Sequence, residues 1–281
     1  MSEEPKLLVT LENGIKRITF NRPKTRNSVD GETFELIQPG NGGSGDGRIA
    51  RHCFVRRRRS VLCSGADLSS FGAMDVANYD VTTSLRERTN PAILAMRAMP
   101  KPIIARVHGP AAGIGCNYAL ACDIIIASEQ AYFAELFVRI GLMPDGGGTY
   151  FFPRMVGYQK AFELMALGEV VPAPEAARIG IANKCVPFAE LDATVNADGG
   201  TIGGCARNCT GEKLRRGLNH ALNSDLASAL EFEAVNQGDC FHSADFREGV
   251  TAFLQKRKPV FTGKTGAHAA RVLKSCGAYG L

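Results

Sequence analysis

The sequence predicts an α/β fold that ends in a helical C-terminal region. Over the first two thirds of the chain, short apolar runs typical of buried strands alternate with helical patterns, and helical patterns dominate the last third. The stretch 108–149 shows this alternation most clearly, because a helix of small residues, the apolar run 124–127 and a glycine-rich turn follow one another. These observations indicate an α/β core with a helical appendage.

The composition is that of an ordinary globular protein. The chain has 281 residues, of which 45% are hydrophobic and 22% are charged. The sequence has no apolar run near the roughly 18 residues that a membrane span needs. Residues 1–14 are acidic and lack the basic and apolar regions of a signal peptide. We therefore expect a cytoplasmic protein without a membrane partner.

The charges and the cysteines favour neither nucleic acid nor a metal as a partner. The formal net charge is only +5, and much of it comes from the run 56–59, which is four arginines. Such a run is also typical of nucleic-acid-binding surfaces, but a solvated face or a sequence anomaly is the better interpretation. The nine cysteines are scattered, which favours reduced, buried thiols over a metal site.

The first predicted elements are a β-hairpin and a helix. Two alternating runs in residues 6–20 meet at Asn13-Gly14, which is a strong signal for a tight hairpin turn. Residues 27–30 then provide the cap of a helix over residues 31–38.

Later in the chain, prolines and glycines mark where the elements begin and end. Strands are predicted over 103–107 and 124–127. Helices are predicted over 83–99, 116–122, 158–167, 173–179, from 191 onward, and over 214–222, 226–234 and 243–255.

Two windows interrupt this order. Residues 50–62 carry arginines where a buried strand is expected, and residues 197–212 are rich in glycine and poor in pattern. Our hypothesis is that both windows are products of compensated frameshifts, which a reading of the gene in its other frames would test. If the residues are genuine, we expect a distorted strand before Cys63, because unpaired buried charge is costly.

The central stretch 108–149 contains the parts for a proton transfer beside a carbonyl group. Gly113 and Gly115 lead into a helix whose first backbone N–H groups lack partners, and the helix dipole favours negative charge there. Asp145 follows on a loop whose glycines allow close backbone approach. A polarised carbonyl beside one carboxylate suits proton abstraction, although an Asp before glycines also commonly forms a turn.

Four blocks of the sequence carry a resemblance to a known family. The blocks cover residues 21–28, 63–68, 108–123 and 133–157, and their order and spacing make the signal strong. The chain resembles the enoyl-CoA hydratase/isomerase (crotonase) family over nearly its whole length.

The resemblance implies a fold and a domain organisation. The family's fold is a spiral of ββα units followed by a C-terminal helical region that builds trimers, often paired into hexamers. By this resemblance, residues 1–197 form the core with the coenzyme A site, 198–264 form the helical region, and 265–281 form a disordered tail. A homotrimer or hexamer that acts on an acyl-CoA is therefore expected.

The resemblance also implies the site residues. The backbone N–H groups of Ala66 and Ile114 would form the oxyanion hole, and Asp145 would be the catalytic carboxylate. No metal and no tightly bound cofactor are expected, since coenzyme A is part of the substrate. Coenzyme A would contact Lys24, Arg26, Ser64, Asp67, Leu68, Phe261 and Lys264, although Lys24 and Arg26 could instead be solvated loop charges. The acyl pocket would include Asn117, Phe137 and Gly115.

The residues at the catalytic positions favour one reaction of the family. Hydratases of the family hold a water molecule between two glutamates, and this chain has Asn117 and Phe137 at those positions. Neither side chain transfers a proton at neutral pH. Asp145 stands in the turn that carries the carboxylate of double-bond isomerases, and residues 133–148 are similar to ring-acyl-CoA isomerases of phenylacetate breakdown. An isomerase is therefore predicted.

Other interpretations remain open at this point. Glu135 is a second candidate carboxylate, but we expect it to be solvated, and we expect His108 to be a strand-end residue rather than a catalytic helper. Besides a hydratase, the alternatives are a hydrolase or dehalogenase with Asp145 as the nucleophile, and a catalytically silent oligomeric binding protein.

Overall fold

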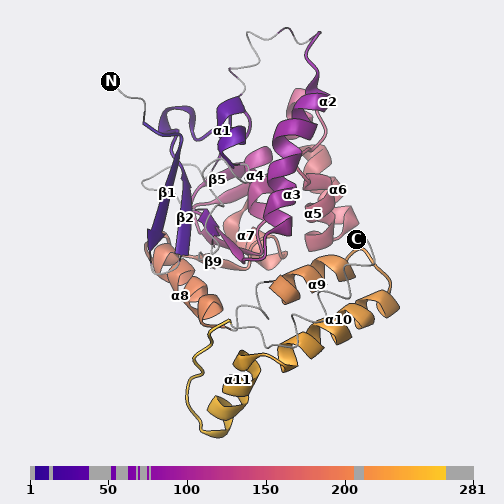
Figure 1. Cartoon of the computed structure of the whole chain (residues 1–281). Helices are drawn as coiled ribbons and strands as arrows, with labels where there is room; N and C mark the ends of the chain where they lie inside the picture. The colour runs from indigo at the N-terminus through magenta and orange to yellow at the C-terminus, as the bar shows by residue number, and fades with distance from the viewer. Residues whose placement is uncertain are drawn as a thin grey trace. The chain divides into compact units, whose positions relative to one another are not determined.

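The computed structural model describes residues 4–12, 15–37, 52–54, 63–67, 69, 75, 77–205 and 212–263. The chain divides into two compact units, one of residues 1–98 and 103–197 and one of residues 99–102 and 198–281 (Figure 1). The first unit combines sheets and helices, and the second is helical. The α/β class and the helical C-terminal region are confirmed.

The larger sheet of the first unit is mostly parallel. Its order among the described residues is β1-β2-β3-β4-β6-β9. Only β1 and β2 run antiparallel, paired from Leu7 with Phe20 to Glu12 with Ile15, which confirms the predicted hairpin. The strands are β1 (Leu7–Glu12), β2 (Ile15–Phe20), β3 (His52–Phe54), β4 (Ile103–Val107), β6 (Ile124–Ser128) and β9 (Lys184–Val186).

A smaller sheet lies in the same unit and has the order β5-β7-β8. Its strands are β5 (Pro110–Ala112), β7 (Tyr132–Ala134) and β8 (Val170–Pro172). β5 follows β4 after two residues, and β7 follows β6 after three, so the chain steps twice from the larger sheet to the smaller one. Residues just after β5 and β7 therefore lie close together, which positions the candidate site.

The central strand β4 is buried at all five residues, as its apolar pattern predicts. Arg106 is the one charged residue of this apolar strand, and only 3% of its surface is exposed. Its guanidinium donates to both carboxylate oxygens of Asp192, at 2.7 and 3.0 Å. A bidentate ion pair of this kind offsets the cost of burying the charge.

The helices of the first unit agree with the predicted ones, and α5 is an additional helix that was not predicted. The helix predicted over 83–99 is a continuous run of α2, a π-helical turn at Leu85–Thr89, and α3. Asp30 caps α1, because its side chain accepts a hydrogen bond from the Thr33 N–H at 2.9 Å. The helices are α1 (Gly31–Ile37), α2 (Val81–Ser84), α3 (Asn90–Ala98), α4 (Ile114–Leu120), α5 (Gly148–Val156), α6 (Tyr158–Leu167) and α7 (Ala173–Arg178).

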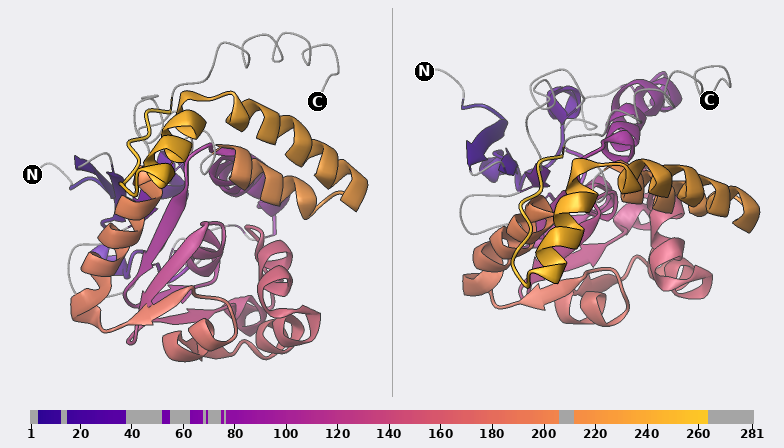
Figure 2. Two further views of the ribbon diagram at one scale, coloured as in Figure 1. Left: turned by 90° about the horizontal axis from the view of Figure 1, so that it is seen from below. Right: turned by 60° about the horizontal axis from the view of Figure 1, so that its bottom comes forward.

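The last helices lead into and form the second unit. In both views of Figure 2, α9 and α10 lie side by side. Ser243 caps α11 by accepting a hydrogen bond from the Phe246 N–H at 3.1 Å, as predicted. The helices are α8 (Leu191–Gly204), which begins in the first unit, α9 (Leu214–Ala221), α10 (Leu226–Phe241) and α11 (Ala244–Leu254).

The two irregular windows contain regular structure. Residues 52–54 form β3 between β2 and β4, with His52 paired to Lys16 and Ile103. The expectation that residues 197–212 lack a pattern is wrong for 197–204, because α8 continues to Gly204. The four arginines at 56–59 and residues 206–211 lie outside the described residues, as does the predicted tail 265–281.

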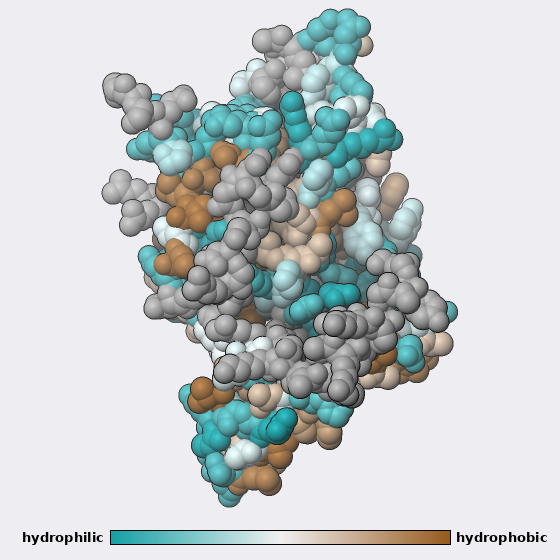
Figure 3. Space-filling view, in the orientation of Figure 1, coloured by the Kyte–Doolittle hydropathy of each residue, from teal (hydrophilic) through white to brown (hydrophobic). Residues whose placement is uncertain are grey.

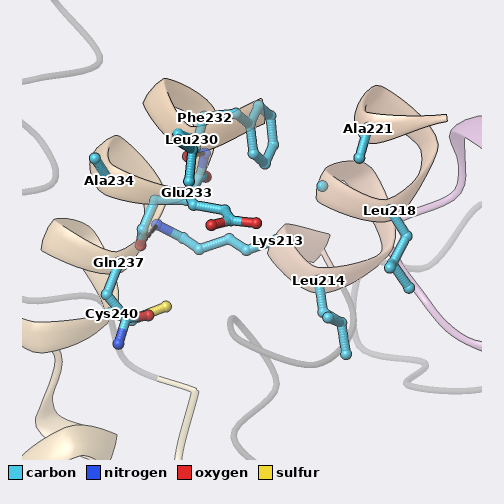
Figure 4. Close-up of a pocket in the computed structure, with 12 residues that line it drawn as sticks. Lys213, Leu214, Leu218, Ala221, Leu230, Phe232, Glu233, Ala234, Gln237 and Cys240 are labelled. Carbon is cyan, nitrogen blue, oxygen red and sulfur yellow. Dashed lines mark hydrogen bonds between the residues drawn. The ribbon is translucent and has the colours of Figure 1, made fainter. Parts of the chain in front are cut away.

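The second unit has a pocket and exposed apolar side chains. The pocket lies between α9 and α10, and Lys213 extends toward α10 (Figure 4). Its ammonium group donates to the Asp239 carboxylate at 2.7 Å. None of the residues that line it is a predicted site residue. Figure 3 shows hydrophobic residues among hydrophilic ones on α11, where Phe253 and Leu254 are exposed.

Two features of the described residues bear on the predicted partners. None of their helices combines the length and apolar character needed to cross a bilayer. The same part of the chain contains no group of three or more His, Cys, Asp and Glu side chains arranged to hold a metal ion.

Candidate active site

The site begins where the chain turns from β5 into α4. Gly113 caps the helix with φ +52°, a conformation that residues with a side chain rarely adopt. Its carbonyl accepts hydrogen bonds from the Cys116 and Asn117 N–H groups at 2.9 and 3.2 Å. Ile114 is the first residue of the helix, so its own N–H has no partner within the helix.

A second loop, residues 63–67, lies directly beside this helix start. Cys63 pairs with Ala111 of β5, and the Ala112 N–H donates to the Cys63 carbonyl at 3.0 Å. Gly115 in the first turn of α4 is so close that a Cβ there would lie 2.5 Å from the Cys63 Cβ. A glycine at 115 therefore lets α4 approach the loop.

The proposed oxyanion donors belong to these two segments. A Cβ at Gly113 would lie 3.8 Å from the Gly65 Cα, so the backbones just before Ala66 and Ile114 are neighbours. Gly65 has φ +103°, and its carbonyl accepts from the Val29 N–H at 2.9 Å. Among the described residues, neither the Ala66 N–H nor the Ile114 N–H donates to a backbone carbonyl.

The loop that carries Asp145 also contacts the start of α4. Gly146, with φ +54°, packs against the Ile114 side chain so closely that a Cβ would overlap with it. Asn117 donates from Nδ2 to the Asp145 carbonyl at 2.8 Å, and Asn117 is fully buried. Asp145 is therefore attached to the same helix turn that begins with Ile114.

Burial changes the acidity of Asp145. It raises the pKa of this carboxyl to about 6, because the charged form is less well solvated than in water. The Oδ1 atom is buried and has no hydrogen-bond partner among the described residues. A carboxylate with this pKa is ionised at pH 7 and basic enough to accept a proton from carbon.

In hydratases of the family that the chain resembles, two positions carry glutamates, and this chain has Asn117 and Phe137 there. Asn117 has its amide engaged with the Asp145 loop. Phe137 is 8% exposed, and its ring lies 3.7 Å from the position of a Cβ at Gly113. Phe137 thus covers the helix start with an apolar surface instead of an acid.

The expectation that Glu135 is solvated is wrong. It follows β7 directly, and the Gly113 N–H donates to the neighbouring Ala134 carbonyl at 2.9 Å, which draws the segment under α4. Glu135 is 1% exposed. Burial first, and then the charge of Asp145, raise the pKa of its carboxyl to about 8, although hydrogen bonding to Cys116 and Asn117 opposes this.

The predicted coenzyme A residues of the first two blocks lie together. Lys24 and Arg26 are exposed on a loop that runs beside residues 63–67, and the Ser64 N–H donates to the Arg26 carbonyl at 3.3 Å. Asp67 is 9% exposed and forms an ion pair with Arg22 at 3.0 Å.

Arg22 is a residue that the sequence analysis missed, and its position within the first matched block was the available signal. It also forms an ion pair with Asp30 at 3.0 Å, so one guanidinium holds the loop 63–67 to the segment before α1. Asp67 thus serves to hold the loop in addition to any contact with a ligand.

The remaining predicted residues lie elsewhere. Phe261 belongs to the second unit, where its ring packs 3.5 Å from the position of a Cβ at Gly249. Leu68 and Lys264 lie outside the described residues. His108, between β4 and β5, is 5% exposed and its ring centroid is 6.5 Å from that of Phe188, which agrees with a packed strand-end residue.

Known proteins resemble this chain over nearly its whole length. The family model described as enoyl-CoA hydratase/isomerase matches residues 10–264. A "Probable enoyl-CoA hydratase" of Rhodobacter capsulatus is 37% identical over 257 residues, which cover 90% of this chain and 96% of the relative. The 1,2-epoxyphenylacetyl-CoA isomerase of Escherichia coli is 33% identical, over 92% of this chain and 98% of that protein.

Solved structures share the fold. An enoyl-CoA hydratase subunit I of Geobacillus kaustophilus aligns with a TM-score of 0.84 and 27% identity, over 94% of this chain and all of the other. An enoyl-CoA hydratase of a Polaromonas species aligns with a TM-score of 0.83 and 28% identity, over 91% of this chain and 99% of the other. The resemblance found in the four sequence blocks therefore extends to the tertiary structure.

Proposed function

Because the chain belongs to the enoyl-CoA hydratase/isomerase family, we propose that it is an acyl-CoA double-bond isomerase with Asp145 as the catalytic base. The observation that carries this proposal is the attachment of Asp145 to the first turn of α4, through Asn117 and Gly146. The raised pKa of Asp145 supports it, since the base must exchange a proton reversibly with carbon.

The mechanism needs two N–H donors and one carboxylate. The thioester carbonyl of an enoyl-CoA accepts hydrogen bonds from the Ala66 and Ile114 N–H groups. Asp145 takes a proton from one carbon, and the donors stabilise the resulting dienolate oxygen. The protonated Asp145 then returns the proton to a different carbon. The double bond moves, water is neither added nor lost, and the enzyme ends as it began.

The binding of the substrate involves the exposed loops beside the oxyanion donors. Lys24 and Arg26 bind the phosphates of coenzyme A, and Phe137 together with Gly115 and Asn117 shapes the acyl site. The core 1–197 holds this site, while 198–264 builds a homotrimer or hexamer in the cytoplasm. The contacts with coenzyme A also include Ser64, Asp67 and Leu68 of this core, and Phe261 and Lys264 of a neighbouring subunit.

A hydratase is the second candidate. The name of the Rhodobacter capsulatus relative favours it. Hydration requires a base and an acid on one water molecule. The chain offers two carboxyl groups, the buried Glu135 and the partly buried Asp145, and the charge of Asp145 raises the pKa of Glu135. The reaction products separate the two candidates, because only a hydratase adds water.

The decisive experiment supplies a 3-enoyl-CoA and follows the conjugated 2-enoyl-CoA that isomerisation forms. We expect turnover by the wild-type protein and a loss of about 10²-fold or more in Asp145→Asn, which removes the proton acceptor but keeps the shape. Glu163→Gln on the exposed face of α6 is the matched control and should remain as active as the wild type.

The other outcomes each point to a different function. A 3-hydroxyacyl-CoA product would indicate a hydratase, and release of free coenzyme A that depends on Asp145 would indicate a hydrolase. If the wild type and Asp145→Asn are equally inert toward these thioesters while they still bind coenzyme A, a binding protein is the better description.

A further inference from the structure

Glu135 is a buried carboxyl group that the proposed isomerisation does not use. It is 1% exposed, and neither of its oxygens has a hydrogen-bond partner of good geometry among the described residues. A buried carboxylate without partners is costly, because it loses its hydration and gains nothing in return. We therefore looked to the groups around Glu135 for a role that offsets the cost of burying its carboxyl group.

A second unpaired group lies beside it. Asn117 is fully buried, and its Nδ2 is engaged with the Asp145 carbonyl at 2.8 Å, while its Oδ1 has no partner among the described residues. Gly113 joins the two segments, because its N–H donates to the Ala134 carbonyl at 2.9 Å and its own carbonyl accepts from the Asn117 N–H at 3.2 Å, so Glu135 lies beside the first turn of α4. An exchange of the amide nitrogen and oxygen would turn an oxygen toward the Asp145 carbonyl, so the present orientation is the favourable one.

One proton satisfies both groups. An ionised Glu135 would present only acceptors to the Asn117 oxygen, whereas a neutral carboxylic acid has an O–H that can donate to it. The titratable groups that face Glu135 are the Cys116 thiol on α4 and the Asp145 carboxyl on the loop before α5. Burial and the charge of Asp145 favour the neutral form of Glu135, whereas hydrogen bonding to the Cys116 thiol and to Asn117 opposes it less strongly.

We propose that Glu135 is a positioning residue, which as a neutral acid donates a hydrogen bond to Asn117 Oδ1 and so holds the loop of Asp145 against α4. The chain of contacts runs from Glu135 through the Asn117 amide to the Asp145 backbone. Glu135 itself touches no reacting atom. This proposal rests on the proposed function where it concerns turnover, and on the protonation of Glu135 alone where it concerns structure.

The pKa values give this arrangement a pH range. The pKa of Asp145 is raised to about 6 and that of Glu135 to about 8, so between these values the first is ionised and the second is neutral. Two carboxyl groups whose environments separate their pKa values divide the roles of base and neutral donor. Above pH 8 Glu135 ionises, its hydrogen bond is lost, and its charge opposes that of Asp145.

The test in turnover compares two substitutions. Glu135→Gln keeps a neutral donor for Asn117, and Glu135→Met keeps the volume but removes the donor. For conversion of a 3-enoyl-CoA at pH 7, we expect Met to lower kcat by about fivefold to tenfold with little change in KM, since one hydrogen bond is lost. The Gln variant should lose less than about threefold, again by hydrogen-bond strength.

The pH profile separates positioning from mere packing. The wild-type kcat should rise through pH 6 and fall through pH 8, while Glu135→Gln should keep the rise and lose the fall. A fall at pH 8 that persists in Glu135→Gln overturns the proposal, and so does a Met variant with wild-type turnover and profile. Glu163→Gln serves as the control, with the unchanged wild-type profile.

An infrared measurement decides the proposal without turnover. At pH 7 the wild type should show the carbonyl stretch of a neutral carboxylic acid, absent from Glu135→Gln and lost as the pH rises through 8. Asn117→Ala should shift this band, because it removes the acceptor. If the wild type has no isomerase activity but shows the band, the proposed function fails and the protonated Glu135 stands; if the band is missing, the positioning role fails whatever the activity.

Discussion

At the scale of single residues, small side chains decide how closely the parts of the site approach. Gly115 has no room for a methyl group, because a Cβ would lie 2.5 Å from both the Cβ and the carbonyl oxygen of Cys63. The contact involves backbone, so the loop 63–67 would have to move. Movement of this loop displaces the Ala66 N–H.

We predict that Gly115→Ala lowers both stability and turnover. The overpacking should cost about 1–3 kcal/mol in the free energy of unfolding, measured by urea denaturation. Turnover of a 3-enoyl-CoA should fall by about 10²-fold if one oxyanion donor is misplaced. Gly200→Ala is the matched control, since a Cβ at Gly200 in α8 meets nothing within 4 Å. A Gly115→Ala protein as stable and active as the wild type would contradict this packing.

Glu135 shows that residue type alone does not decide whether a carboxyl is solvated. Charged side chains in an irregular segment are mostly exposed, which is why the sequence favoured a solvated Glu. The Ala134 carbonyl is bonded to Gly113, and this contact between distant residues brings Glu135 under α4. No local pattern records such a contact.

At the scale of elements, ion pairs hold the loop 63–67 to the segment before α1. Arg22 contacts Asp67 and Asp30 at 3.0 Å each, and its side chain is 16% exposed. Lys6 also bonds to Asp30, at 2.9 Å. The first two of the four sequence blocks that resemble the family are thus joined by one guanidinium.

We predict that Arg22→Met destabilises the protein and impairs the site together. Two partly buried carboxylates lose a partner, which should cost about 2–4 kcal/mol of unfolding free energy, near the lower end for buried pairs. Thermal and urea unfolding measure the loss. Arg178→Met is the control, because its ion pair with Glu175 lies on the exposed surface of α7 and such pairs contribute little. Equal effects of the two substitutions would count against a role for Arg22 in the loop.

The predicted elements between 103 and 179 agree with the structure, because each has its own signal. β4 and β6 are apolar runs, and α6 ends at Gly168 in the left-handed conformation, with φ +60°. The expectation that residues 197–204 lack a regular pattern was wrong because each glycine lowers helix propensity by only about 1 kcal/mol. In α8 the preceding turns continue the helix through these glycines to Gly204.

At the scale of the whole molecule, the buried acids couple folding to pH. Glu135 has a pKa of about 8 and Asp145 of about 6 in the folded chain, against 4.5 and 3.8 as ordinary values. Between the ordinary and the raised pKa of each group, the folded state therefore binds more protons than the unfolded state. Stability from these two groups is greatest below pH 4 and falls as the pH rises to 8.

We predict that Glu135→Gln flattens part of this dependence. The difference in unfolding free energy between Glu135→Gln and the wild type should grow from pH 4.5 to pH 8 and stay constant above pH 8, since only the wild type must bury an acid that prefers to ionise. Urea denaturation at several pH values, with Glu163→Gln as the reference, measures this difference. A constant difference across the range would mean that Glu135 titrates normally.

The sequence by itself determined the fold class, the family and the identity of the candidate groups Ala66, Ile114 and Asp145. These depend on local signals, namely apolar period, glycine turns and the order of four short blocks. Only the tertiary structure decided that Glu135 is buried, that Arg22 joins two loops and that Asn117 holds the Asp145 backbone. These features arise from contacts between residues far apart in the chain, where desolvation and hydrogen bonding depend on neighbours that no local pattern specifies.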